Sequence, residues 1–396
     1  MKITTLFSHL FFLCLILSSC ASAPIFNVKN VSNIQTLYLD DYFPGYSSID
    51  IESEDDVFSL DDEMKEMVQT QLLGENDPYQ RSKKLLTHIF SREHLDIAYQ
   101  NSANLTATQT YHSQTANCMS LTIMSYALAE AAGLNVVFQE VKIPEYWVRN
   151  GQYSMLTGHV NLLIKRPSDH RVAFFWERSR GLEIDFDPSI LKRSFPKEDI
   201  DKSTVLAMFY TNKGAQAMVD EDYLKAYSYF KRATLAAPKF ASSWNNLAIL
   251  YRMINNYTLA EKVYHYTLTI APDNLTTVSN LAMLLEKQGA IDKARMLEKQ
   301  IHEKRLKNPY YHALLGDEAL YNGQIKQAKI HFKNAIKINN NIHEFYYGLA
   351  KVYYQLDEYI LAEDTLKKAI KLNKSSTTDM QYVAKLNLIR STELNE

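Results

Sequence analysis

The sequence predicts a mixed α+β domain followed by an all-α solenoid of helical repeats. In the first half, an apolar helical run at residue 118 precedes several strand-like runs, which is the order of an α+β domain. In the second half, small residues recur every 34 positions. A length of 396 residues, 46% of them hydrophobic, leaves room for two or three domains with a real core.

The overall charge gives no sign of a nucleic-acid partner. The formal net charge is −2, and the basic residues are not gathered into one arm. Nucleic-acid binding needs a basic face that neutralises phosphates, so we expect no such partner. Tyrosine is abundant, with 26 residues, and at regular helical spacing most of these side chains are expected to pack in the core.

The segment 1–19 reads as a bacterial lipoprotein signal peptide. A short positive start at Lys2 precedes an apolar stretch that is too short to span a bilayer. The Leu-Ser-Ser-Cys run that ends at Cys20 resembles the lipobox, which implies that this thiol carries the lipid and that the acyl chains anchor the protein. Ala21 follows, so we expect the periplasmic side of a bacterial outer membrane. The alternative is an ordinary cleaved signal with an incidental cysteine.

We divide the rest of the chain by composition and periodicity. Residues 20–59 are expected to be a lipidated tether and acidic linker, with an aromatic cluster at 37–46. The α+β domain is expected over 60–200, five helical repeats over 207–374, and a polar capping helix over 375–396.

Within the α+β domain, capping signals and apolar runs predict the order of elements. One helix is expected to start at Pro78, after the N-cap Asp77, and another at Cys118, ending near Gly133. Strand-like runs follow, with a loop expected over 142–157. The predicted strands cover 135–141, 159–164, 172–176 and 182–186.

The repeats resemble the tetratricopeptide repeat (TPR), which has the same period. Each unit has an alanine four residues before the position where an aromatic residue is expected. These alanines are Ala226, Ala260, Ala294, Ala328 and Ala362. Small residues let paired helices approach closely, and the aromatic fills the groove of the next pair. The third unit is degraded, because Glu298 stands where an aromatic is expected. We expect this solenoid to hold a protein or peptide partner.

One cysteine is left for chemistry once Cys14 and Cys20 are assigned to the leader, and it is Cys118. A lone thiol in an oxidising compartment is easily replaced unless it has a role. The start of a helix and a neighbouring imidazolium both favour the reactive thiolate. His159, at the start of a strand, is the candidate partner, although a redox-sensing thiol is a weaker alternative.

The region from Tyr111 to Ser189 resembles the transglutaminase-like branch of the papain-type superfamily. The matching motifs are the cysteine at a helix start, Ala132-Gly133-Leu134, Gly158-His159-Val160-Asn161 and Asp187-Pro188-Ser189. The family often has an aromatic soon after the histidine, where this chain has Asn161 and Leu162. The resemblance implies that Cys118 is the nucleophile, His159 the base and then the acid, and Asp187 the orienting group.

Two parts of this site stay open. Asp185 and Asp187 are two apart and share a face of a strand, so either could orient His159. The oxyanion hole would combine the Cys118 amide with Gln114 or Asn117.

Other chemistries have weaker support in the sequence. His112 is a rival base, although its context resembles a loop. No second cysteine and no closely spaced histidine pair suggests zinc, so we expect no metal, and we expect no cofactor.

These residues lead to two hypotheses. The first is a lipid-anchored cysteine peptidase or transglutaminase-like acyltransferase, in which Cys118 attacks an amide carbonyl and forms an acyl-enzyme. The second is a non-catalytic envelope scaffold, in which the repeats bind protein partners and the cysteine domain is degenerate.

Overall fold

The computed structural model describes most of the chain, and the fold is built from these parts. The described residues are 33–90, 98–100, 102–113, 115–142, 147–150, 153–156, 159–165, 181–186, 196–373, 382–387 and 390. Two features expected from the sequence, the lipidation site Cys20 and the strand over 172–176, lie outside them. Within the described residues, no helix combines the length and the apolar character needed to cross a bilayer.

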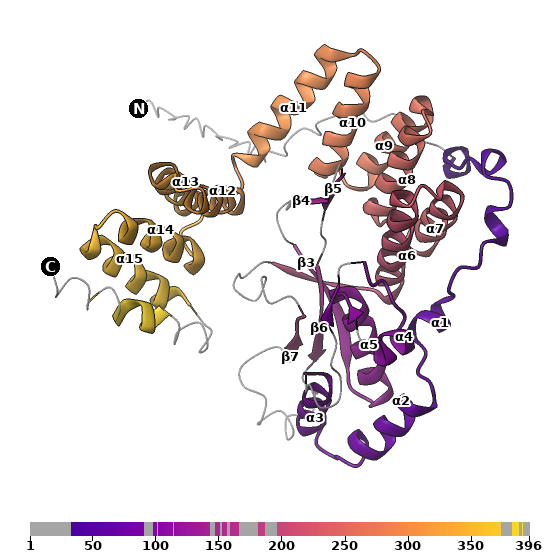
Figure 1. Ribbon diagram of the computed structural model, residues 1–396, viewed down its shortest axis with the longest axis horizontal. Coiled ribbons are helices and arrows are strands. Elements are labelled where there is room, and N and C mark those ends of the chain that lie inside the picture. The colour runs from indigo at the N-terminus through magenta and orange to yellow at the C-terminus, as the bar shows by residue number, and fades with distance from the viewer. Residues whose placement is uncertain are drawn as a thin grey trace, which may run out of the picture.

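In the N-terminal half, the described helices pack beside one antiparallel sheet (Figure 1). The helices are α1 (Glu54–Phe58), α2 (Asp62–Met67), the π-helical η4 (Val68–Leu72), α3 (Pro78–Phe90), α4 (Ala107–His112) and α5 (Cys118–Ala131). Both predicted helix starts, at Pro78 and Cys118, are confirmed. Gly133 follows α5 with φ of +68°, a left-handed conformation that suits glycine just beyond a helix end.

The sheet as described has four antiparallel strands in the order β7-β6-β3-β8. The strands are β3 (Val136–Val141), β6 (His159–Lys165), β7 (Gly181–Ile184) and β8 (Lys197–Ile200). The first three lie within one or two residues of the prediction. The fourth was not predicted, because Lys-Glu-Asp-Ile lacks the apolar pattern of a buried strand. It lies at the edge of the sheet, where charged side chains remain in contact with water.

Two short pairings complete the described strands. β1 (Ala98–Tyr99) and β2 (Thr115–Ala116) are parallel, and β4 (Trp147–Asn150) and β5 (Tyr153–Leu156) form a hairpin. The loop predicted over 142–157 is therefore wrong in part, because the hairpin lies inside it. The aromatic and polar residues of that stretch carry no clear alternation that would have indicated strands.

The apolar face of the sheet packs against α5. Val160, Leu162 and Ile164 alternate along β6 and are buried against helix residues such as Ile123 and Leu128. Because side chains alternate between faces in a strand, His159 and Asn161 lie on the other face of β6. The same hydrophobic core continues into the first helix of the second half.

Between residues 202 and 372, which the structure describes in full, ten helices follow one another in five consecutive pairs (Figure 1). They are α6 (Lys202–Val219), α7 (Tyr223–Ala236), α8 (Ala241–Met253), α9 (Tyr257–Ile270), α10 (Leu275–Lys287), α11 (Ile291–Arg305), α12 (Pro309–Tyr321), α13 (Ile325–Ile338), α14 (His343–Gln355) and α15 (Tyr359–Leu372). Each pair covers one period of the sequence pattern, which confirms the predicted repeat.

The packing between paired helices follows the predicted small-residue positions. A Cβ added to Gly214 would lie 2.6 Å from the ring of Phe230, so this position must be glycine for the two helices to pack as they do. In the degraded third unit, Glu298 is exposed, where the other units bury an aromatic or leucine. Tyr382 and Leu386 are buried beyond α15, within the stretch expected to cap the solenoid.

The segment before α1 is packed against the repeats, where the sequence suggested a free linker. Its short 3-10 helices are η1 (Ile34–Leu37), η2 (Asp40–Tyr42) and η3 (Tyr46–Ser48). Leu37 and Phe43 are buried in one core with residues of α7, α8 and α9. We call residues 37–46 the strap; it is the aromatic cluster seen in the sequence, and burying its side chains accounts for its composition.

Candidate active site

Cys118 is the first residue of α5, and the residue before it caps the helix. The Asn117 Oδ1 accepts a hydrogen bond from the Ser120 N–H at 2.8 Å. The first N–H groups of a helix lack partners within the helix and carry partial positive charge, which favours an anion such as a thiolate. Cys118 is partly exposed, so a substrate can reach it.

Two hydroxyl groups inside α5 fix where the helix begins. The Ser120 Oγ donates to the Ala103 carbonyl at 2.6 Å and accepts from the Leu105 N–H at 2.9 Å. The Thr122 Oγ1 donates to the Val160 carbonyl at 3.2 Å. Since Val160 follows His159 in β6, this bond ties the helix that carries the thiol to the strand that carries the imidazole.

The histidine and one aspartate form a buried pair beside this helix. The His159 Nε2 donates to the Asp185 Oδ1 at 2.7 Å, with side chains only 2% and 4% exposed. Cys118 also lies beside the His159 ring, close enough to raise the pKa of the imidazole. Because Nε2 faces the carboxylate, Nδ1 is the ring nitrogen left for the sulfur. The order of contacts is therefore Cys118, His159 and Asp185.

The environment of His159 favours its protonated form. Burial alone would lower the pKa of the imidazole, because it penalises the charged ring. The hydrogen bonds and charges of Asp185 and Cys118 outweigh burial and raise the pKa of His159 to about 9. At neutral pH the ring is then an imidazolium, the state that stabilises a neighbouring thiolate.

A second polar contact lies beside this pair on the same face of the sheet. The Asn161 Nδ2 donates to the Glu183 Oε1 at 2.8 Å, and Lys197 also forms an ion pair with Glu183. Asn161 is completely buried, and its Oδ1 has no hydrogen-bond partner among the described residues. An unsatisfied buried oxygen costs free energy, so this amide is a destabilising part of the site.

The sequence also suggested four other residues for the site, and the structure describes two of them. Asn117 uses its oxygen to cap α5 and its Nδ2 to donate to the Asn104 Oδ1 at 2.8 Å, so both ends of the side chain are occupied. His112 pairs with the Asp61 Oδ2 at 2.5 Å. Gln114 and Asp187 lie outside the described residues.

The sequence pointed to the thiol and the imidazole, but not to the groups that place them. Thr122 and Ser120 are polar residues inside an apolar helix, and that contrast was the available signal. The choice of Asp185 was not evident from the sequence either, because Ile184 is opposite Leu162 and the next residue, Asp185, reaches His159 diagonally and not from the position directly opposite.

The arrangement can support nucleophilic chemistry at a carbonyl. It combines a thiol at a helix start, a hydrogen-bonded imidazolium and a carboxylate that fixes the ring. Among the described residues, no group of three or more histidine, cysteine, aspartate or glutamate side chains could hold a metal ion.

A comparison with known families identifies two of the repeats in the second half. The tetratricopeptide repeat family matches residues 309–342 and 343–376. Helices α6–α15 form an all-α TPR solenoid. Repeats of this kind are suited to binding proteins or peptides.

One curated relative is distant and matches only in part. The mouse (Mus musculus) protein O-mannosyl-transferase TMTC3 is 25% identical over 167 residues, which cover 38% of this chain. The match covers 18% of TMTC3, so the chain spans about a fifth of that relative's length.

Two solved structures are similar to part of the chain. PilF of Pseudomonas aeruginosa is 18% identical, covering 49% of this chain and 90% of its own, with a TM-score of 0.26. YrrB, described as a TPR protein with an unusual peptide-binding site, is 15% identical, covering 44% and 90%, with a TM-score of 0.23.

Proposed function

We propose that the N-terminal half is a cysteine enzyme of the transglutaminase-like, papain-type class that acts on amide bonds of peptides or proteins. The observation that carries this proposal is the chain of contacts from Cys118 through His159 to the buried Asp185. A structural cysteine would not need an imidazole whose pKa is raised to about 9 beside it.

In the proposed reaction, the Cys118 sulfur attacks the carbonyl carbon of the substrate amide. The new S–C bond forms an oxyanion, which the N–H groups at the start of α5 stabilise. As the C–N bond breaks, His159 gives its proton to the leaving amine. The product of this step is a thioester between Cys118 and the acyl group.

The second step returns the enzyme to its starting state. A water molecule, or the amine of an acceptor, attacks the thioester carbon and gives its proton to His159. The S–C bond then breaks and the thiolate is restored beside the imidazolium. Asp185 keeps the ring oriented throughout and stays ionised.

In this proposal, the solenoid and the signal peptide determine where the reaction takes place. In our proposal, the repeats bind the protein substrate or a partner and bring it to the lipid-anchored enzyme. Diacylation of Cys20 would hold the protein on the periplasmic side of an outer membrane. Metabolic labelling with a palmitate analogue tests the anchor, since Cys20→Ser should lose the label and Cys118→Ser should keep it.

An electrophilic peptide tests the catalytic proposal directly. The full chain is treated with a glutamine-containing peptide vinyl sulfone, and the adduct is measured by intact mass. We expect one adduct, on Cys118, formed at least tenfold more slowly in His159→Gln. Matched control variants are His112→Gln, which alters the other histidine–aspartate pair, and Cys118→Ala, which removes the thiol.

The alternative is a scaffold in which the cysteine domain does no chemistry. It predicts that the vinyl sulfone reacts with Cys118 at the same rate in the wild type and in His159→Gln. That result would remove the catalytic proposal and leave the binding role of the repeats.

A further inference from the structure

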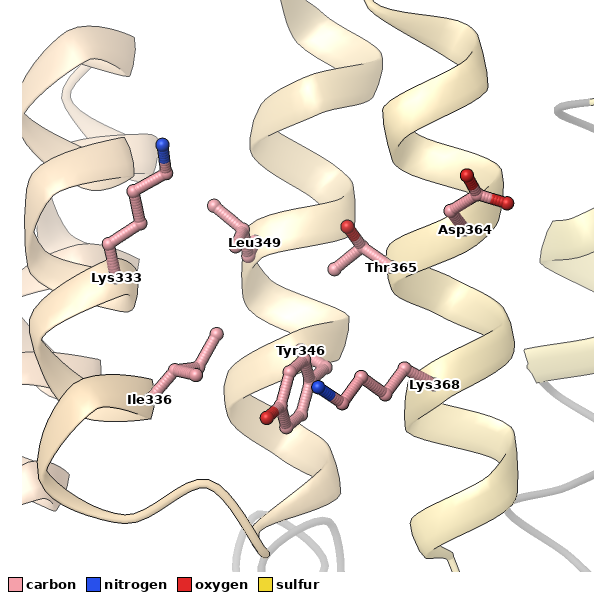
Figure 2. Close-up of a pocket in the computed structure, with 7 residues that line it drawn as sticks. All are labelled: Lys333, Ile336, Tyr346, Leu349, Asp364, Thr365 and Lys368. Carbon is pink, nitrogen blue, oxygen red and sulfur yellow. The ribbon is translucent and has the colours of Figure 1, made fainter.

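A groove at the C-terminal end of the solenoid is lined by three helices. It has a volume of about 320 Å³ and lies between α13, α14 and α15 (Figure 2). Its lining includes Lys333 and Ile336 of α13, Tyr346 and Leu349 of α14, and Asp364 and Lys368 of α15. Both lysines are exposed, whereas Tyr346 and Leu349 are buried and form the floor.

The same groove occurs three repeats earlier, between α7, α8 and α9. The positions three periods before the C-terminal groove carry Lys231 for Lys333, Thr234 for Ile336, Trp244 for Tyr346, Leu247 for Leu349, Lys262 for Asp364, and Tyr266 for Lys368. Both grooves thus have a lysine on the first wall, and an aromatic and a leucine on the floor. The repeat places them identically because each unit is built from the same helix pair.

The earlier groove is filled by the strap. Lys231 donates to the Asp40 carboxylate at 2.6 Å and to the Tyr46 hydroxyl at 2.7 Å. The ring of Tyr38 stacks on Trp244, with centroids 5.7 Å apart. The groove therefore binds a segment of chain through one carboxylate and one aromatic ring two residues before it.

The C-terminal groove keeps both of these binding features. Lys333 stands where Lys231 holds the carboxylate, and Tyr346 stands where Trp244 holds the ring. Lys368 lies over the Tyr346 ring, 4.7 Å from its centroid, and adds a second positive charge. The one acidic group that lines the groove, Asp364, has Lys367 at 3.6 Å. Asp364 stands where the earlier groove has Lys262, so each groove carries two lysines.

We propose that the groove between α13, α14 and α15 binds a segment of a partner protein that carries an aromatic residue two positions before an aspartate or glutamate. The aromatic ring stacks on Tyr346 in place of the Lys368 side chain, and the carboxylate pairs with Lys333 and Lys368. This site goes beyond the proposed amide chemistry and holds whether or not Cys118 is catalytic.

A peptide copied from the strap is the probe. A fluorescent peptide with the sequence of residues 34–48 is titrated against the full chain and followed by fluorescence anisotropy. We expect binding that Lys333→Glu weakens at least tenfold. Lys293→Glu, which makes the same charge change at an exposed position on α11, should change the affinity less than twofold.

A charge exchange makes the test specific for the carboxylate. The peptide with Asp40→Lys should bind the wild type at least tenfold more weakly, and should regain affinity for the Lys333→Glu variant. The lysines exchanged in the protein are exposed, so the fold is expected to persist, and circular dichroism checks it.

Three results would overturn the proposal. The first is no binding of the strap peptide at concentrations up to about 1 mM, the weakest affinity worth assigning. The second is loss of binding in Lys231→Glu but not in Lys333→Glu, which would place the peptide in the groove of the strap. The third is a dimer in sedimentation that Lys333→Glu dissociates, which would assign the groove to a second copy of this chain.

Discussion

At the scale of single residues, the site depends on a histidine that is buried and still charged. Burial of an imidazolium is costly unless an anion accompanies it. Asp185 at 2.7 Å and the Cys118 thiol supply that compensation, and the histidine–aspartate pair is almost fully shielded from water. The pair therefore links folding stability to the protonation of one ring.

The pH dependence of stability follows from the pKa of His159. The pKa is about 9 in the folded chain, against roughly 6.5 in an unfolded one. A raised pKa gives stability that is fully present below pH 6.5 and is lost as the pH rises through 9. The largest contribution is on the order of 3 kcal/mol.

We expect the wild type to lose free energy of unfolding relative to His159→Gln as the pH rises from 6 to 10. Urea unfolding of both proteins at each pH, followed by tryptophan fluorescence, measures the difference, in which the other titrating groups cancel. Parallel pH profiles for the two proteins would mean that His159 is not held as an imidazolium.

At the scale of elements, the start of α5 and the start of β6 must stay in register. The bond from Thr122 to the Val160 carbonyl joins them, and Thr122 is completely buried. Without this bond, the position of α5 relative to β6 depends more on apolar packing, which is less directional.

We expect Thr122→Val to lower the free energy of unfolding by about 1–2 kcal/mol, because it leaves the Val160 carbonyl without this donor in the core. Adduct formation with the peptide vinyl sulfone should also slow. The control is Thr87→Val on α3, whose hydroxyl bonds to the Lys83 carbonyl at an exposed position and should matter less. Equal effects of the two substitutions would contradict this role for Thr122.

The close packing of α14 on α13 leads to a prediction about Gly348. A Cβ added to Gly348 would lie 2.1 Å from the Phe332 ring, so α14 and α13 cannot stay in place with a larger residue there. We expect Gly348→Ala to destabilise the C-terminal repeats by about 1–3 kcal/mol through overpacking. Gly74→Ala, where no atom lies within 4 Å, should be nearly neutral. Thermal melting followed by circular dichroism compares them.

Most of the fold was predictable because its signals are local or periodic. The helix at Cys118 has a cap and an apolar run, and the small positions of the repeats return at a constant spacing. The edge strand β8 was not predicted, because its residues are charged. The packing of the strap was not predicted either, because its contacts are with residues far away in the sequence. The identity of the aspartate at His159 was not predictable, because Asp185 reaches the ring diagonally from the end of β7 and no local pattern encodes that contact.

At the scale of the whole molecule, the two halves are joined by a shared core and by the strap. Residues of α6 such as Val205 and Phe209 are buried with the α+β core. Glu52, just before α1, forms an ion pair with Lys213 of α6 at 2.9 Å. The halves are thus built as one unit around the first repeat.

The strap should detach from the repeats when Lys231 of α7, which holds Asp40, is removed. Lys231 and Tyr227 outweigh the effect of burial and hold the pKa of Asp40 below its usual value, so the carboxylate stays ionised and bonded. We expect Lys231→Ala to speed cleavage within residues 37–46 by thermolysin at least tenfold, and Lys225→Ala, an exposed lysine of α7, to have no effect. Mass spectrometry of the fragments measures this, and equal rates would mean that the strap is not held through Lys231.

The central claim is that His159 ionises the Cys118 thiol, and the pH profile of iodoacetamide labelling tests it most directly. The labelling rate of the full chain is measured from pH 5 to 10, with the adduct located by mass spectrometry. We expect the wild-type thiol to be labelled already at acidic pH, and His159→Gln to need a more alkaline pH for the same labelling rate. If both proteins show the same pH profile, the thiol is not activated by His159 and the account fails.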